Sequence, residues 1–170
     1  KDILILSKNK DVWDLNSAEL KSMIKEEFDI WGSVQAASGK KNGRPKNPSW
    51  TRNELSLCLY YYHTTEDKNE LLSKLNPIHD KISKNIRKLR VEHGERFSPN
   101  ENFRNPNGVW RKLRNFAYLD PSIDDDSLRD EHGSNLDKEV FNRYPNKDSL
   151  KNLTTVVQVI SEQNNLNLNV

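Results

Sequence analysis

Cysteine, histidine and nucleotide-binding motifs are scarce in this chain of 170 residues. The single cysteine, Cys58, excludes an internal disulfide and a multi-cysteine zinc site. The four histidines are scattered, and no pair has the H-E-x-x-H or H-x-H spacing that places two imidazoles on one metal. A Walker loop and a G-x-G-x-x-G sequence are also absent. We therefore expect no metal, no cofactor, no small-molecule substrate and no catalytic role for this chain.

Long apolar runs are lacking as well. No segment approaches the ~20 apolar residues that span a bilayer, and the first residues, Lys1 to Leu6, lack the apolar region of a signal peptide. Hydrophobic content is 34% and charged content 31%, which favours a small core built from helices. Cys58 lies in an apolar helical pattern, which favours packing over nucleophilicity. We expect a cytoplasmic protein without a membrane partner.

The charge is not strongly of one sign, because the formal net charge is only +2, but it is unevenly distributed. Five positive residues and no acid lie between Lys40 and Arg52, and six positive residues and two acids lie between Lys81 and Arg96. The segment from Asp120 to Glu139 holds eight acids and two bases. Such segregation predicts one basic surface suited to phosphate.

The chain divides by composition into four parts. Residues 1-33 have the pattern of an N-terminal helical extension, and residues 34-48 form a basic linker or arm containing Gly and Pro. Residues 49-162 form the main domain, and residues 163-170 are expected to be a frayed tail. Within the arm, Gly43-Arg44-Pro45 is the core of a minor-groove hook, although a solubilising linker has the same composition.

Several helix starts are predicted in the main domain. Thr51 and Glu54 have capping-box spacing, so a helix should begin there and run to about Tyr62. A second helix is expected over 68-75, whereas 78-101 fits either a short helix or a mobile loop. Further helices should start at Ser134 and near Asn146, and the acidic segment before Ser134 is expected to be a loop or a wing.

The stretch from Phe103 to Phe116 has the pattern of a short basic helix. With Pro106 in its first turn, Val109, Leu113 and Phe116 share one buried face. The N-terminal end then presents three candidates for reading base edges, Arg104, Asn105 and Asn107, because Asn pairs with adenine and Arg with guanine in the major groove. An amphipathic helix with a solvated basic face fits the same pattern.

The order of these motifs resembles a known family. The motifs are Asn47 to Leu55, Leu75 to His79, the F-R-N-P-N-G-V sequence from Phe103 to Val109, and Gly133 to Phe141. They resemble the N-terminal domain of McrA-like, modification-dependent HNH restriction endonucleases over about residues 47 to 145. The resemblance implies a helix-turn-helix or winged-helix-like fold, mainly α with little β, that binds modified double-stranded DNA. The leading candidate for the modification is N6-methyladenine.

The resemblance also implies roles for individual residues. Asn105 and Asn107 would lie near base edges, with Arg104, Arg111, Lys112 and Arg114 on phosphates. Arg52 and the arm residue Lys46 are further candidates for phosphate contacts. Because N6-methylation occupies one amino hydrogen, a methyl sensor needs an apolar contact as well. The candidates for this contact are Trp110, Trp50 and Tyr61.

The HNH nuclease itself is not expected here, since the chain has neither paired histidines nor C-x-x-C pairs. It is therefore interpreted as the sensor domain of a larger enzyme or as a stand-alone relative. Two other readings remain open, a sequence-specific regulator indifferent to methylation and a protein-interaction module without salt-dependent DNA affinity.

Overall fold

The computed structural model describes residues 47–94, 97–129 and 131–168, which belong to the compact unit Lys41–Val170. The predicted N-terminal extension and the arm residues Arg44 and Lys46 lie outside the described residues. Helices and helical turns are the regular elements of the described part, where no strand occurs. They are α3 (Arg52–Thr64), α4 (Lys68–Leu72), α5 (Ile78–Lys88), η3 (Leu89–His93), α6 (Pro106–Leu119), η4 (Asp126–Leu128), α7 (Asn135–Arg143), η5 (Lys147–Ser149) and α8 (Leu150–Asn164). The predicted mainly α class is therefore confirmed.

Local capping chemistry sets where two of these helices begin. The Thr51 hydroxyl accepts a hydrogen bond from the Glu54 amide at 3.2 Å, and the Glu54 carboxylate accepts one from the Thr51 amide at 2.8 Å. Ser134 and Asp137 form the same reciprocal pair at the start of α7. Each box satisfies amide groups that the first turn of a helix leaves unpaired. Both predicted starts are confirmed.

The segment from 68 to 101 follows its prediction in part. α4 ends at Leu72, short of the predicted end at residue 75, and Leu75 is 91% exposed. The following segment forms the helix α5, one of its two predicted forms, because Ile82 and Ile86 recur four residues apart and are fully buried. The side-chain oxygen of Asn76 accepts a hydrogen bond from the amide of Ile78, the first residue of α5, at 2.9 Å.

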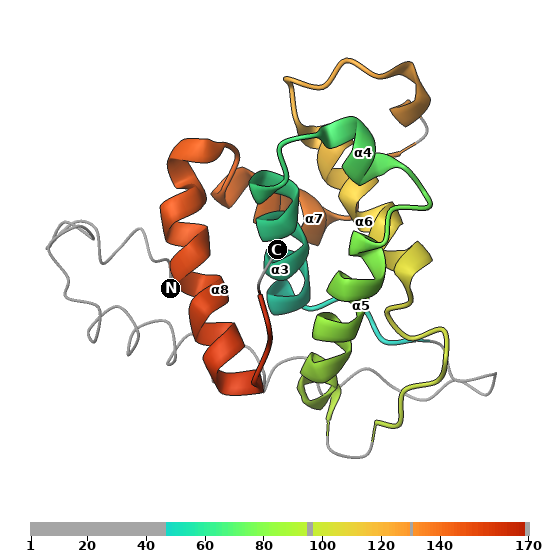
Figure 1. Cartoon of the computed structure of the whole chain (residues 1–170), viewed down its shortest axis with the longest axis vertical. Coiled ribbons are helices and arrows are strands. Elements are labelled where there is room, and N and C mark those ends of the chain that lie inside the picture. Colours follow the sequence, from blue (N-terminus) through green and yellow to red (C-terminus); the bar gives the residue numbers. More distant parts are fainter. Residues whose placement is uncertain (1–46, 95–96, 130, 169–170) are drawn as a thin grey trace, which may run out of the picture. The chain divides into compact units, whose positions relative to one another are not determined.

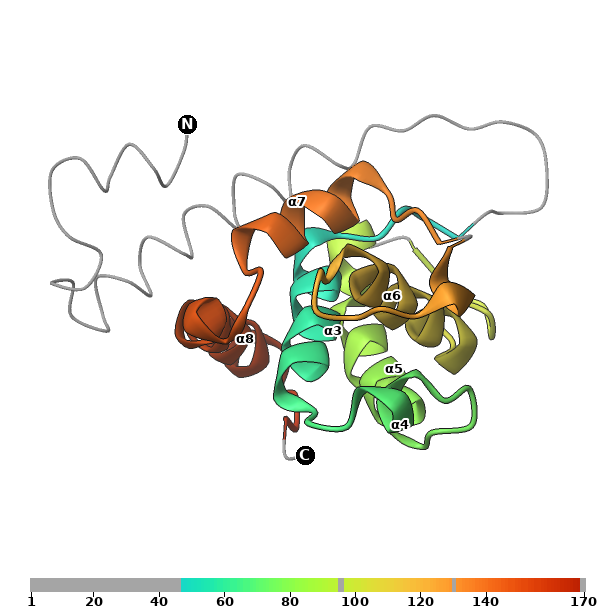
Figure 2. The same ribbon diagram turned by 90° about the horizontal axis from the view of Figure 1, so that it is seen from above.

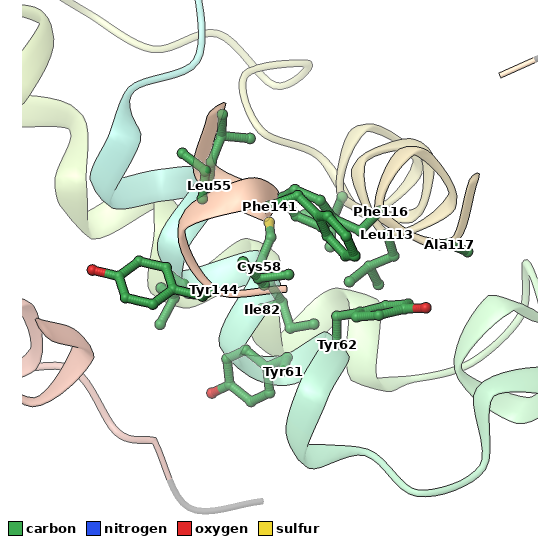
Figure 3. Packing of buried hydrophobic residues seen from close by; sticks show 14 of the residues in the cluster. Leu55, Cys58, Tyr61, Tyr62, Ile82, Leu113, Phe116, Ala117, Phe141 and Tyr144 are labelled. Atoms are coloured by element: carbon green, nitrogen blue, oxygen red, sulfur yellow. The ribbon is translucent and has the colours of Figure 1, made fainter. Parts of the chain in front are cut away.

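α3 is the central helix of the domain. It contacts α5, α6, α7 and α8, and both views place it between α8 on one side and the α5–α6 pair on the other (Figures 1 and 2). The hydrophobic core consists of buried side chains of α3 and of the helices that pack against it, and Figure 3 shows part of it. These side chains include Leu55, Cys58, Tyr61 and Tyr62 of α3, Ile82 of α5, Leu113, Phe116 and Ala117 of α6, and Phe141 and Tyr144 near α7.

The acidic segment between α6 and α7 is anchored by one apolar side chain. Leu128 in η4 is 3% exposed, whereas Asp124, Asp125 and Asp126 around it are exposed. Since the described part of this segment contains only a helical turn, a wing built from strands is not formed there. The acidic residues lie on a loop, which was one of the two predicted forms of this segment.

The C-terminal tail packs against the domain instead of fraying. After α8, Asn165 adopts a left-handed backbone conformation with φ of 51°, and the chain turns back towards α5. The Asn165 carbonyl accepts a hydrogen bond from the Lys88 ammonium at 3.0 Å, and the Asn167 carbonyl accepts one from the Asn85 amide at 2.8 Å. Leu166 and Leu168 pack against the core. The predicted frayed tail is thereby corrected as far as residue 168, because long-range hydrogen bonds offset its entropy.

His63 gives the fold a pH-dependent stability. Its imidazole is buried and bonds the Tyr144 carbonyl at 2.7 Å, and burial lowers the pKa of His63 below its ordinary value. The unfolded chain, with a histidine pKa of about 6.5, then binds more protons than the folded chain. The free energy of unfolding should therefore fall as the pH drops below about 6.5.

This expectation can be checked by urea unfolding at several pH values between about 7.5 and 5, the range that brackets the ordinary histidine pKa. His63→Gln should show a shallower loss of stability towards acid than the wild type. His132→Gln is the control, because His132 is exposed. Parallel pH profiles for the wild type and His63→Gln would contradict the assignment.

Candidate functional site

α6 is the helix that the sequence predicts to read DNA, and it begins in a fixed turn. Asn105 is its N-cap, and the Asn105 side-chain oxygen accepts a hydrogen bond from the Gly108 amide at 2.8 Å. A Cβ atom at Gly108 would lie 3.3 Å from that oxygen, so glycine keeps the cap tight. Pro106 follows at the first helical position. Because its oxygen is engaged in the cap, Asn105 does not offer the free amide that bidentate pairing with adenine requires, and we reassign it to capping.

The inward face of α6 is as predicted, since Val109, Leu113 and Phe116 are fully buried. The opposite side carries Asn107, Arg111 and Tyr118, which are exposed and spaced by four and seven residues along one line. We call these three residues the outer ridge of α6. At 1.5 Å per residue the ridge is about 16 Å long, a length that fits along a major groove.

The outer ridge holds polar groups that the fold does not use. Within the described part of the chain, the side chains of Asn107 and Arg111 have no hydrogen bond or ion pair. Tyr118 is 43% exposed, and its ring meets the His132 ring edge to face at 6.1 Å between centroids. Tyr118 was missed by the sequence interpretation, although its position seven residues after Arg111 would have placed it on this line.

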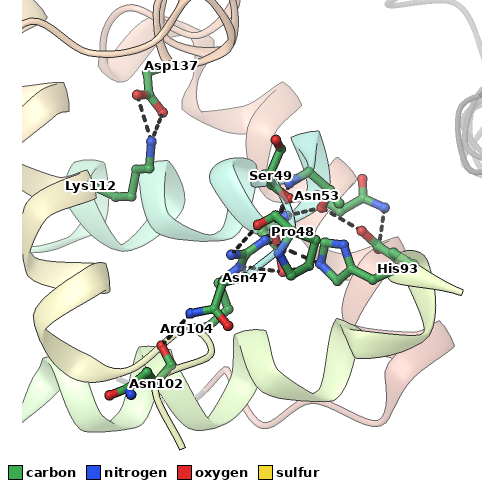
Figure 4. A network of polar contacts seen from close by, with 12 residues as sticks. Asn47, Pro48, Ser49, Asn53, His93, Asn102, Arg104, Lys112 and Asp137 are labelled. Carbon is green, nitrogen blue, oxygen red and sulfur yellow. Dashed lines mark hydrogen bonds and ion pairs between the residues drawn. The ribbon is translucent and has the colours of Figure 1, made fainter. Parts of the chain in front are cut away.

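Arg104 lies inside the protein, not at the base-reading end of α6. It is 4% exposed, and its guanidinium donates two hydrogen bonds of 2.8 Å to the carboxylate of the fully buried Glu54. The remaining donors reach the carbonyls of Pro48 at 3.0 Å and Ser49 at 2.8 Å (Figure 4). The predicted roles of Arg104 in reading bases or contacting phosphate do not fit this placement, and we reassign it to holding the N-terminal segment on α3.

The backbone of Arg104 supports the same role. Its φ of 48° is in the left-handed region, which costs a residue with a Cβ about 1–2 kcal/mol. This conformation lets the Arg104 carbonyl accept a hydrogen bond from Ser83 of α5 at 2.7 Å while the side chain turns towards Glu54. Phe103, fully buried, packs against the rings of His93 and Phe97. The F-R pair before the cap therefore fixes the start of α6 on α3 and α5.

A second carboxylate completes this polar network. Glu92 accepts hydrogen bonds from the Thr51 hydroxyl at 2.6 Å and the Asn53 amide at 2.8 Å. Burial raises the pKa of Glu92 above its ordinary value, while both hydrogen bonds act in the opposite direction. His93 Nε2 is hydrogen-bonded to Glu54 Oε1 at 2.9 Å, the oxygen that also accepts from Arg104 Nε. All of these groups are satisfied by one another, which marks the network as structural.

Three other predicted phosphate contacts are engaged within the fold. Lys112 donates to both oxygens of the fully buried Asp137, at 2.9 and 2.8 Å, and is reassigned to joining α6 to α7 (Figure 4). Arg114 donates to Glu131 at 2.8 Å and to the Ser127 carbonyl at 2.6 Å. Arg52 is ion-paired with Glu139 of α7. The ion pairs of Arg114 and Arg52 partly neutralise their charges, whereas Arg111 keeps its full charge.

The three candidate methyl contacts, Tyr61, Trp50 and Trp110, already have partners within the fold. Tyr61 is fully buried and its hydroxyl accepts a hydrogen bond from Asn85 at 3.1 Å, so it cannot contact a ligand and its prediction is corrected. Trp50 lies under Arg104 and Lys112, 4.4 and 5.5 Å from the ring centre.

Trp110 is held from three sides. It donates its indole N–H to the Leu72 carbonyl at 2.8 Å. Its ring lies under Lys74 and Arg114, at 5.5 and 5.1 Å. Both tryptophans are half-buried. Of the cations over their rings, Arg104, Lys112 and Arg114 are ion-paired, whereas Lys74 has no carboxylate partner in the described residues.

Comparison with protein-family models, curated proteins and solved structures gives no match. Function must therefore be argued from the described residues themselves. Among them, no group of three or more histidines, cysteines, aspartates or glutamates could hold a metal ion. Every helix in the described ranges is also too short or too polar to cross a membrane.

Proposed function

We propose that this chain binds double-stranded DNA through the outer ridge of α6. In this proposal it is the sensor of N6-methyladenine for a modification-dependent restriction endonuclease of the McrA-like group. The observation that carries the proposal is the exposure of Asn107 and Arg111, one turn apart and without a partner in the described structure. An amide and a guanidinium are the groups that pair with adenine and guanine in the major groove.

The outer ridge also supplies the apolar contact that a methyl sensor needs. Tyr118 exposes part of its ring on the same line as Asn107 and Arg111. Burying one methyl group against such a surface is worth about 0.8 kcal/mol, which corresponds to a preference of roughly fourfold. A preference above about tenfold would require a methyl group on each strand, or a penalty against the unmodified base.

The architecture supports an exposed reading helix rather than a complete winged helix. The connection from η3 to α6 runs from Gly94 to Asn105, which is longer than the three or four residues of a helix-turn-helix turn. We therefore propose a reading helix on a mainly α fold, without the helix-turn-helix turn and, in the part of the chain that the structure describes, without a wing. α6 would lie along the groove with its whole outer ridge, while Lys74 beside Trp110 contributes positive potential at its edge.

The proposal is tested by a salt titration of binding to one duplex in unmethylated, hemimethylated and fully N6-adenine-methylated forms. A cytosine-methylated duplex is the control, and anisotropy of a labelled duplex is the readout. We expect salt-sensitive binding that is strongest for the fully methylated form. Equal, salt-sensitive binding to all forms would instead identify a methylation-indifferent, sequence-specific regulator. Absence of salt-dependent binding would contradict a DNA partner altogether.

Variants on the outer ridge locate the contact. Asn107→Ala should weaken binding by about 1–3 kcal/mol and relax the preference at one base position. Asn152→Ala is its matched control, since Asn152 is an exposed asparagine on α8. Loss of affinity in both variants, or in neither, would contradict base reading by Asn107.

A further inference from the structure

An open cleft, lined by no residue of the outer ridge of α6, lies where α5 meets the C-terminal tail. Its volume is about 440 Å³, and it is open to solvent. The residues that line it are Pro77, Asp80, Lys81, Lys84, Asn85 and Asn167. Four of these six belong to α5 and Pro77 is its N-cap, so the cleft is formed by one helix face and a short piece of tail.

The tail wall of this cleft is held in place by several hydrogen bonds. Asn85 is 5% exposed and donates to both the Tyr61 hydroxyl at 3.1 Å and the Asn167 carbonyl at 2.8 Å. The Ser161 hydroxyl bonds the Leu166 carbonyl at 3.0 Å, and Lys88 bonds that of Asn165. The cleft is therefore preorganised, because its far side is tied to α5 and α8 and does not have to be ordered on binding.

The charges at the cleft favour an anion. Within the described residues Lys81 and Lys84 have neither an ion pair nor a hydrogen bond, although Asp80 lies beside them. Lys88, one turn further, has only a carbonyl as partner. Residues three apart on a helix have Cβ atoms about 5–6 Å apart, so Lys81 and Lys84 can reach the same oxyanion. Ammonium groups act as point charges towards phosphate.

We propose that the cleft between α5 and the C-terminal tail binds a phosphate group through Lys81 and Lys84. The source of the phosphate is the DNA backbone, so this inference rests on the proposed function. It gives the domain a second contact, independent of base sequence and of methylation. A free phosphate has the same chemistry, and the experiment separates the two sources.

The test uses the full chain and the variant Lys81→Gln/Lys84→Gln. Since each neutralised phosphate contributes about 0.9 to the slope of log affinity against log salt, the double variant, which removes one phosphate contact, should lower that slope by about 0.9 for all duplexes. Its preference for the methylated duplex should be unchanged. Lys138→Gln/Lys147→Gln is the control with the same change in charge, at exposed lysines of α7 and η5. A slope equal to that of the control would overturn the inference.

A titration with inorganic phosphate, followed by the amide resonances of α5, tests the cleft without DNA. Shifts in the wild type that vanish in Lys81→Gln/Lys84→Gln and grow in Asp80→Asn would support a phosphate site. If the wild type binds no duplex but shows these shifts, the proposed function fails while the site stands for free phosphate. If duplex binding is normal but neither the slope nor the shifts depend on the two lysines, only the cleft assignment fails.

Discussion

Replacing Arg104 by alanine should lower the free energy of unfolding by about 3–5 kcal/mol, because the change leaves the carboxylate of Glu54 buried without its cation. Two hydrogen bonds to Glu54 and the links to Pro48 and Ser49 are lost together. Urea unfolding followed by circular dichroism measures the loss. Among the predicted site residues, Arg104 should thus have one of the largest effects on stability and none on base preference.

The control for this variant is Arg90→Ala. Arg90 is exposed in η3 and has no partner in the described structure, so its replacement should change stability by less than about 0.5 kcal/mol. Base preference is compared for Arg104→Ala at a temperature where it remains folded. A variant that keeps wild-type stability but loses base or methyl preference would restore Arg104 as a base-reading residue.

Local chemistry made the helices predictable. The capping pairs Thr51 with Glu54 and Ser134 with Asp137 are three residues apart, and the sequence alone contains all that they need. The buried face of α6 follows from helical spacing for the same reason. These features depend on neighbours in sequence, so reading them required no knowledge of the tertiary fold.

Long-range pairing made much of the candidate site unpredictable. Glu54 and Arg104 are 50 residues apart. Nothing in the spacing of the basic helix shows that a cation flanking it pairs with a buried carboxylate. A positive charge beside a predicted reading helix fits phosphate and a buried carboxylate equally well. The tail was misread in the same way, since the Asn85 amide that holds Asn167 lies 82 residues before it.

Two neighbouring cations on α6 differ in whether the fold uses them. Replacing Lys112 by alanine should lower stability, whereas replacing Arg111 should lower DNA affinity. Lys112 donates to both oxygens of Asp137, which is fully buried. Lys112→Ala should therefore lower the free energy of unfolding by about 3–5 kcal/mol. Arg111, the preceding residue, is exposed without a partner in the described structure. Arg111→Ala should leave stability within about 0.5 kcal/mol and weaken DNA binding.

The size and kind of the Arg111 effect identify its contact. If Arg111 reads a base, Arg111→Ala should cost about 1–3 kcal/mol and relax specificity at one position. If it contacts a phosphate, all duplexes should weaken together and the salt slope should fall by about 1. Lys138→Ala, on the exposed side of α7, is the control for loss of one charge. A stable Lys112→Ala that binds DNA poorly would reverse the assignment, because Lys112 would then face DNA and Asp137 would not depend on it.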